Sequence, residues 1–435
     1  MPHASTTAAG DSRAKRRRLG LAFVLLHGLG GGAGAQTAPP IDLESPPNLD
    51  RPGLFRAGSF YLTPYLHVGT LGVDTNVFYT ATERQTDFTA SGGPGFEIVR
   101  PFGRESRFVV DGGLDYLYFA KTESQRRLNG YGTALLDVWG VKTHLAIEER
   151  YLKTFSRPSY EVNDRVEQET EGTRALFRRD LGDRLRLVLF GSRKRTVTDN
   201  QYYLGTNLGD TLTENRYLAG GELQLGLSVK TRLVAGGENS WHRFERLPDR
   251  DAQSSVAYGG FRTDQAALVS GRALGGMRWF RLDKGAIRNV VYADVNAVWN
   301  ISFKTKLGGI FTRNIDYSAF ATSGPTPTNR NELGEVFFEK VLVRNVYLRL
   351  FARQHRLVSD GDVALVIPGE GIVLSERNDR VREAGAEIGY QFRSRIRAGV
   401  TAMYTDRDSS IQSFGIQGLL AGFTLQYDPP QPTSR

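Results

Sequence analysis

Apolar and polar residues alternate with a period of two along most of the chain between Ser59 and Tyr427. In 383–392 one set of alternate positions is apolar: Ala384, Ala386, Ile388, Tyr390 and Phe392. Successive side chains of a strand point to opposite faces, so this pattern predicts a strand with one wholly apolar face. The same alternation occurs in 291–300, 346–355 and 395–405. The faces of 331–344 are ambiguous around Phe337 and Phe338.

Short and long connections alternate between these strands. Tight turns are expected near 101–106, 139–142, 181–184, 228–231, 299–304, 344–345 and 393–395. Longer polar loops are expected near 80–86, 156–166, 199–214, 246–254, 321–331, 359–380 and 407–412. This arrangement is typical of an outer-membrane barrel. The predicted fold class is therefore all-β, an antiparallel transmembrane β-barrel of 18 strands running from 60–70 to 413–427, with both termini on the periplasmic side.

A soluble β-propeller or β-solenoid is the rival fold, because it also contains many short strands. It predicts a repeated sequence motif, which the chain lacks, and a buried apolar face. It does not account for a polar face that carries Arg353, Glu387, Arg395 and Arg397. An apolar face towards lipid and a charged face towards a wet lumen explain both sets of positions.

Composition agrees with a β fold and narrows the chemistry. Glycine is abundant, at 49 of 435 residues, and tight turns and bent strands use glycine where helices disfavour it. There is no cysteine, which excludes disulfides, cysteine-ligated zinc and thiol nucleophiles. The six histidines are not spaced as metal ligands, and no catalytic constellation emerges. The sequence therefore predicts a protein that is not an enzyme and needs no cofactor.

The N-terminus has the pattern of a secretory signal peptide. Arg13 and the basic run Lys15–Arg18 precede a short apolar run, Leu19–Leu26, and small residues follow to Ala35. The apolar run is too short to span a bilayer. Removing 1–35 takes away five basic residues and one acidic residue, which lowers the formal charge from +9 to +5. Export and this mild charge argue against a nucleic-acid partner.

These patterns divide the chain into four segments. Residues 1–35 are the predicted signal peptide, and 36–58 a proline-rich periplasmic leader outside the fold. Residues 59–427 form the predicted barrel, and 428–435 a short proline-rich tail.

Basic residues gather on the predicted lumen face near the C-terminal end. Arg349, Arg353, Arg395 and Arg397 share the inward parity, and Arg407 continues the row of Arg395 and Arg397 at the loop end. Rows of arginine in a water-filled pore bind carboxylates and select anions, and hydrated arginines need no partner. The alternative is that they pair with Glu383 and Glu387 on the adjacent strand and set the pore size.

The chain resembles a family of outer-membrane β-barrel porins associated with capsule and exopolysaccharide secretion. The resemblance lies in Leu62–Leu66 and Gly72–Phe78 of the opening strand, Gly93–Glu97, Arg380–Ala384, Gly389–Tyr390, Tyr404–Ser409, and Phe423–Tyr427 of the last strand. It covers about 370 residues. The chain departs from barrels that end on an aromatic residue, because eight residues follow Tyr427.

The resemblance implies an outlet for exopolysaccharide or capsular polysaccharide in the cell outer membrane. It also implies a periplasmic polysaccharide-export protein as a partner, beside outer-membrane lipid, lipopolysaccharide and the barrel assembly machinery. Two alternatives stay open: a passive diffusion porin for small solutes, and a structural or adhesive surface barrel.

Overall fold

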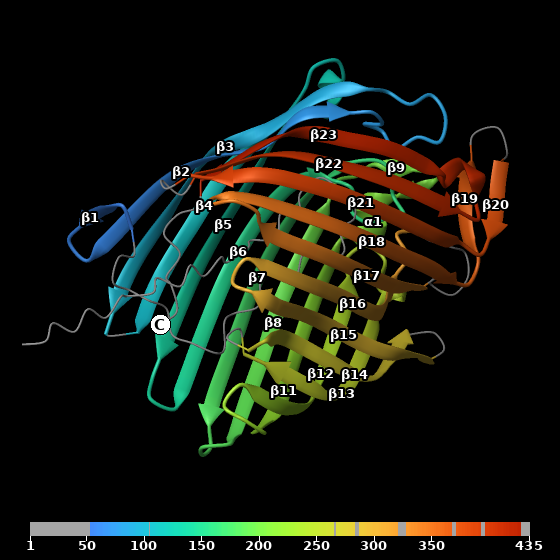
Figure 1. The fold of residues 1–435 in the computed structure, drawn as a ribbon. Helices are drawn as coiled ribbons and strands as arrows, with labels where there is room; N and C mark the ends of the chain where they lie inside the picture. The colour runs from blue at the N-terminus through green and yellow to red at the C-terminus, as the bar shows by residue number, and fades with distance from the viewer. Residues whose placement is uncertain are drawn as a thin grey trace, which may run out of the picture.

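The computed structural model describes residues 53–103, 105–264, 267–282, 287–320, 328–367, 371–392 and 396–427. Eighteen long antiparallel strands form one sheet that closes on itself where β2 pairs with β23 (Figure 1). The predicted 18-stranded antiparallel barrel is therefore confirmed.

The wall strands of the first half are β2 (Phe60–Asp74), β3 (Asp87–Phe102), β4 (Ser106–Phe119), β5 (Arg127–Trp139), β6 (Thr143–Ser156), β7 (Val166–Asp180), β8 (Leu185–Thr198), β11 (Glu214–Gly226) and β12 (Thr231–Phe244). Those of the second half are β13 (Ala252–Thr263), β14 (Val269–Leu282), β15 (Ile287–Ser302), β16 (Thr305–Tyr317), β17 (Thr328–Val341), β18 (Val346–Asp360), β21 (Asn378–Gln391), β22 (Ile396–Ser409) and β23 (Ile416–Tyr427). Each wall strand pairs with the next along the chain, so neighbours in sequence are neighbours in the wall.

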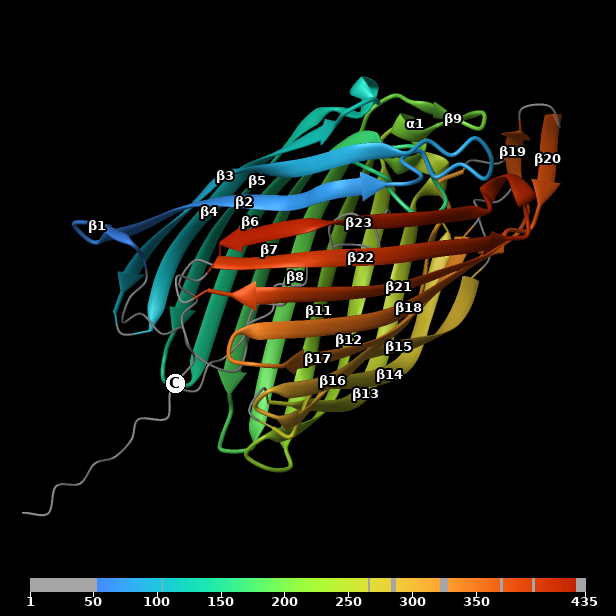
Figure 2. The same ribbon diagram turned by 45° about the horizontal axis from the view of Figure 1, so that its top comes forward.

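The remaining elements lie at the two ends of the barrel (Figure 2). The loop end carries β9 (Tyr202–Tyr203), β10 (Thr206–Asn207), α1 (Leu208–Leu212), β19 (Val363–Ile367), β20 (Gly371–Ser375), and the short 3-10 helices η1 (Glu123–Gln125), η2 (Pro248–Arg250) and η3 (Gln412–Phe414). The short strand β1 (Phe55–Ala57) lies at the opposite end and pairs with β2. No helix of the described residues is long and apolar enough to cross a membrane.

The two faces of the wall have the polarity that the alternation predicts. Apolar side chains on the outer face are accessible, including Ile388 and Val400, which are 50% and 57% exposed. Charged side chains of the intervening positions are buried, such as Glu383 at 4% and Arg397 at 8%. In a closed barrel the sheltered face is the inner one, so the outside is apolar and the inside polar. The predicted faces of 383–392 and 395–405 are confirmed.

Glycines of the inner wall make room for aromatic rings. Phe337 of β17 lies over Gly308 of β16, where an added Cβ would stand 2.1 Å from the ring. Tyr347 of β18 covers Gly389 of β21 in the same way. Phe337 therefore faces inwards although it is apolar, which explains why β17 shows no clean alternation. The high glycine content serves this packing.

The segment boundaries differ from the prediction at one point. Residues 53–57, assigned to the leader, belong to the fold, because β1 forms a hairpin with β2 through Phe55↔Leu62 and Ala57↔Phe60. The predicted signal peptide, most of the leader and the tail lie outside the described residues.

The predicted turns and loops correspond to observed connections, but three connections of the wall are not among them. These are the loop between β4 and β5 (120–126) and the connections between β13 and β14 and between β14 and β15. The wall strands are also longer than the expected ten residues, since most have 13 to 16.

Candidate gate at the loop end of the barrel

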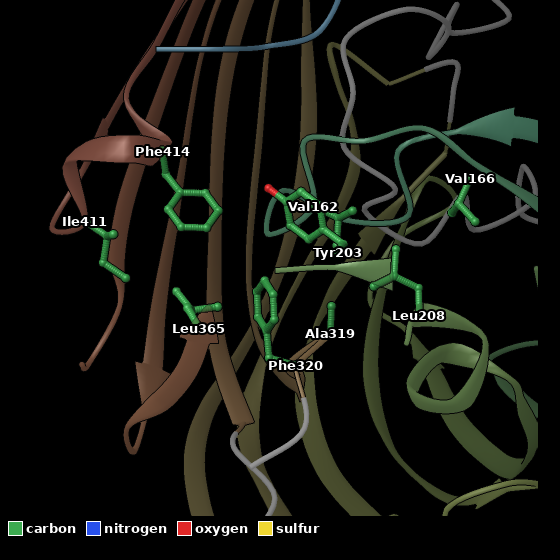
Figure 3. Packing of buried hydrophobic residues seen from close by; sticks show 9 residues of the cluster. All are labelled: Val162, Val166, Tyr203, Leu208, Ala319, Phe320, Leu365, Ile411 and Phe414. Atoms are coloured by element: carbon green, nitrogen blue, oxygen red, sulfur yellow. The ribbon is translucent and has the colours of Figure 1, made fainter. Parts of the chain in front are cut away.

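Loops from distant parts of the chain pack together at the loop end (Figure 3). Their shared apolar cluster consists of Val162, Val166, Tyr203, Leu208, Ala319, Phe320, Leu365, Ile411 and Phe414. These residues come from the β6–β7, β8–β11, β16–β17, β18–β21 and β22–β23 connections or the strand ends beside them. We call this cluster, with the loop segments that supply it, the gate.

Arginine side chains connect the gate loops by donating hydrogen bonds to the backbone carbonyl groups of loop residues. Arg157 donates to the carbonyl oxygens of Val77 (2.7 Å) and Asn163 (2.6 Å). Arg250 donates to those of Ser318 (2.6 Å) and Phe320 (3.1 Å). Irregular backbone inside a barrel has polar groups that no sheet ladder satisfies, and a guanidinium with five donors can serve several of them. The guanidinium groups thus satisfy backbone carbonyl oxygens that a neighbouring strand would otherwise satisfy.

A buried charge cluster ties the gate to the barrel wall. Arg377 and Asp379 are both fully buried and are joined by a 2.9 Å contact from Nε to Oδ2. Arg407 of β22 donates to the same carboxylate and, at 2.9 Å, to the Oδ1 atom of Asn163. The guanidinium of Arg377 also lies 3.8 Å from the centre of the Phe414 ring. One aspartate therefore serves two arginines, with an aromatic face beside one of them.

The gate retains unpaired positive charge. Arg157, Arg165 and Arg250 form no ion pair with any described residue. Buried Nε atoms of Arg250 and Arg407, and one Nη atom of Arg377, have no acceptor in the described part of the chain. Burial lowers the pKa of Arg250 to about 10. Burial and the nearby charge of Arg157 lower the pKa of Arg165 to about 9. Both groups stay protonated at neutral pH.

The gate is tightly packed beside the 157–165 loop and partly strained. A cavity of about 10 Å³ lies between the 157–165 loop and the inner faces of β21 and β22, which is room for about one water molecule. Tyr79 and Leu204 have φ angles of +54° and +48°, a region that costs a non-glycine residue roughly 1 kcal/mol or more. Asn163 and Arg157 hold Tyr79 in place, through a 3.0 Å hydrogen bond to its carbonyl oxygen and a cation–π contact at 3.5 Å.

Below the gate, arginines of the inner wall pair with carboxylates. Arg353 contacts Glu335 at 2.7 Å and Glu383 at 3.1 Å. Arg349 lies 3.7 Å from both Glu335 and Glu339. The side chains of Arg349 and Arg353 are only 13% and 19% exposed. Of the two interpretations, these contacts favour pairing with carboxylates, with Glu335 and Glu339 as partners besides the expected Glu383.

The other predicted site residues are placed as follows. Glu387 faces inwards and accepts a 2.6 Å hydrogen bond from the Tyr347 hydroxyl. Arg397 is buried on the inner face. Arg407 lies higher, in the gate. Arg395 lies outside the described residues.

Sequence reasoning missed most residues of the gate. Glu335 lies in the strand whose faces were ambiguous, and it proves to be the carboxylate that Arg353 and Arg349 share. Arg157, Arg250 and Arg377 lie in loops, where no periodicity shows which way a side chain points. A signal was present only for Arg157, which stands between Phe155 and Tyr160 in a loop expected to be polar.

No protein-family model and no curated protein matches the sequence. Among solved structures, the chain is similar to the siderophore receptor PirA from Pseudomonas aeruginosa, with a TM-score of 0.43, 10% identity and coverage of 86% of this chain and 81% of that one. It is also similar to the copper transporter OprC (TM-score 0.46, 11% identity, coverage 86% and 66%). A bacterial polysaccharide outer-membrane secretin aligns with a TM-score of 0.34, 8% identity and coverage of 84% and 98%.

The architecture defines an outer-membrane β-barrel located in the outer membrane, as predicted. The predicted function is corrected. The resemblance on which the polysaccharide outlet rested has no support from a family model or a curated protein. The similar structures are mostly siderophore and metal receptors or transporters, with the polysaccharide secretin among the matches. These matches do not specifically support the porin alternative.

Proposed function

We propose that the protein is a ligand-gated transporter that takes up a small anionic solute across the outer membrane. The observation that carries the proposal is the gate, an apolar loop cluster held by buried arginines without carboxylate partners among the described residues. Long loops of outer-membrane barrels face the cell exterior, so a solute from outside meets the gate first. A transporter of this kind needs no catalytic group.

The chemistry of the arginines favours an anionic ligand. Arg157 and Arg250 now donate to neutral carbonyl oxygens. Hydrogen bonds from guanidinium to a carboxylate or phosphate are shorter and roughly twice as strong as neutral ones. An anion that reaches these donors would replace the carbonyls, release the loop backbones and open the gate. The polar inner wall below would then pass a hydrated solute.

Conductance in planar bilayers tests the gate. Wild-type protein is expected to be closed at rest and to open when citrate or glucose 6-phosphate is added, whereas glucose has no effect. Opening by glucose to the same extent would contradict the anionic ligand. A large steady conductance without any ligand would contradict the gate itself.

A matched pair of substitutions separates the gate from general loop damage. Leu365→Asp places a carboxylate where the side chain is fully buried among apolar gate residues, which costs several kcal/mol in an apolar cluster. It should hold the gate open. Tyr202→Asp makes the same change where the side chain is 75% exposed, beside the gate residue Tyr203, and should leave conductance unchanged.

The absence of cysteine allows a reversible lock. The backbone N–H of Val366 donates to the carbonyl oxygen of Leu204 at 3.1 Å, so the two residues join different gate loops. A Leu204→Cys/Val366→Cys variant should lose ligand-induced opening when oxidised and recover it on reduction. Equal opening in both states would show that these loops do not have to separate.

A further inference from the structure

The barrel wall has a cleft where β15 and β16 separate near the loop end. β15 pairs with β14 as far as Ile287↔Arg281, but its pairing with β16 begins only at Ala293↔Arg313. Beyond this point β16 continues to pair with β17 up to Tyr317↔Thr328. Residues 287–292 of β15 thus have a strand partner on one side only.

The β16 edge that faces this gap is protected locally. The amide of Ile315 donates to the Oδ1 atom of its neighbour Asn314 at 2.9 Å, and that of Tyr317 to the Oδ1 atom of Asp316 at 3.0 Å. Side chains here satisfy backbone groups that a paired strand would otherwise satisfy. The separation is therefore a stable part of the wall and not a frayed end.

A cavity of about 260 Å³ occupies the separation. Four consecutive residues of β15, from Ile287 to Val290, line it. Because successive strand residues point to opposite faces, a cavity over one face would touch only every second residue. This cavity therefore runs along the open strand edge, through the wall.

The far side of the cavity is lined by charged residues. Arg288 reaches across to Asp360 at the end of β18, with 3.2 Å between Nη1 and Oδ2 and about two fifths of each side chain exposed. Arg330 also lines the cavity, and no described residue forms an ion pair with it. A half-exposed pair contributes little to stability, so one weak pair and one unpaired guanidinium border the opening.

The cleft lies at the outer edge of the apolar belt. Trp299 and Val291 are exposed on the outer face of β15, 46% and 51% respectively. At a rise of about 3.3 Å per residue and a tilt of roughly 40°, Val291 lies about 20 Å and Ile287 about 30 Å above Trp299 along the membrane normal. Measured from Trp299 as its periplasmic edge, an apolar belt of roughly 25 Å ends between Val291 and Ile287. The cleft therefore lies at the level of the lipid headgroups.

We infer that this cleft binds the phosphate headgroup of an outer-leaflet lipid. Arg330 and Arg288 supply the planar donors that suit phosphate, and the exposed Ile287, which also lines the cleft, supplies apolar contact for the start of an acyl chain. The volume is below the roughly 300–1,000 Å³ of drug-sized sites, so it fits a headgroup and not a whole lipid. This inference does not depend on the proposed transport function.

Native mass spectrometry of the full barrel in detergent tests the site. The probes are a soluble short-chain phosphatidic acid, a phosphatidylcholine of the same chain length and inorganic phosphate. Phosphatidic acid should be retained, phosphatidylcholine should bind less, and inorganic phosphate should not displace the lipid. Equal binding of the two lipids, or displacement by inorganic phosphate at similar concentration, would overturn the inference.

Three variants locate the binding. Arg330→Gln should weaken phosphatidic acid binding about tenfold, as expected for the loss of a charged donor. Asp360→Asn should strengthen binding severalfold, because it frees Arg288 from a competing carboxylate. Arg382→Gln is the matched control, an arginine with 49% exposure in the loop-end part of β21, and should change nothing. Wild-type affinity in both Arg330→Gln and Asp360→Asn, or an equal loss in Arg382→Gln, would refute the site.

Discussion

Buried arginines occur both in the gate and on the inner wall, but outside the Arg377–Asp379–Arg407 cluster they bind different partners. In the gate, Arg157 and Arg250 donate to backbone carbonyls. On the wall, Arg353 donates to two carboxylates. The backbone explains the difference: wall strands satisfy their own carbonyls through the sheet ladder, so an arginine there needs another side chain. The carbonyl groups of Asn163, Ser318 and Phe320 lie outside any strand, and an arginine donates to them instead of a strand partner.

The comparison implies two kinds of stability. Wall arginines are matched by charge, so removing one leaves a buried carboxylate unpaired and weakens the whole barrel. Gate arginines hold loops, so removing one loosens the gate and leaves the wall intact.

Arg353→Met should lower the free energy of unfolding by about 3–5 kcal/mol, because it leaves Glu383 buried without its cation and Glu335 with only the more distant Arg349. Urea unfolding in detergent micelles measures the change. The control is Arg353→Met/Glu335→Leu/Glu383→Leu, which replaces the group by apolar side chains and should regain most of the loss. A triple variant as unstable as the single one would show that charge pairing is not the cause.

Val400→Arg should cost about 2–4 kcal/mol, because Val400 faces lipid on the outer side of the wall. Thr401→Arg on the same strand faces inwards beside Glu387 and should cost much less. Refolding yields and unfolding curves in liposomes measure both. The opposite order would mean that the faces of β22 are reversed.

Arg250→Gln should destabilise the gate by about 1.5–3 kcal/mol, since two charged hydrogen bonds to 318–320 are lost. Faster amide hydrogen exchange at 318–320, with an unchanged unfolding midpoint of the barrel, is the expected result. Arg246→Gln changes an exposed arginine in the same β12–β13 connection and serves as the control. A drop in barrel stability with Arg250→Gln would erase the distinction between gate and wall.

Arg382→Met should change the free energy of unfolding by only about 0.2–1 kcal/mol. Arg382 is half exposed and lies 3.4 Å from Asp406, so its pairing is screened by solvent. The same urea experiment measures it beside Arg353→Met. A loss as large as that of Arg353→Met would show that burial does not decide the strength of these pairs.

Much of the wall could be predicted from the sequence, because one apolar face and one polar face leave a period of two. The exception is instructive. In β17 the inward Phe337 and the outward Phe338 are both apolar, since a glycine on the next strand accommodates the inner ring. Alternation fails wherever packing inside the barrel is aromatic.

The gate could not be predicted in this way. A loop has no repeating geometry, so nothing local shows that Phe320 and Phe414 meet inside the barrel mouth. The inward parity of Arg407 was foreseen, but its partners were not, because Asp379 and Asn163 come from other parts of the chain. The predicted function failed for another reason: it rested on a resemblance in short motifs, which describe the wall of a barrel and not what passes through it.

The hairpin at the periplasmic end has a consequence for how neighbouring molecules coexist. One edge of β2 is paired with β3 at Leu62↔Ile98, so β1 occupies the opposite edge, which β23 uses only from Val68 onwards. Without β1, a row of free backbone groups would stand at the seam of every molecule, ready to accept a strand from another copy. Pro64 shortens that row further, because it has no N–H to offer. Residues 53–57 thus cover this edge and prevent strand exchange between barrels in a crowded membrane. Deleting them should allow strand-exchanged dimers to form.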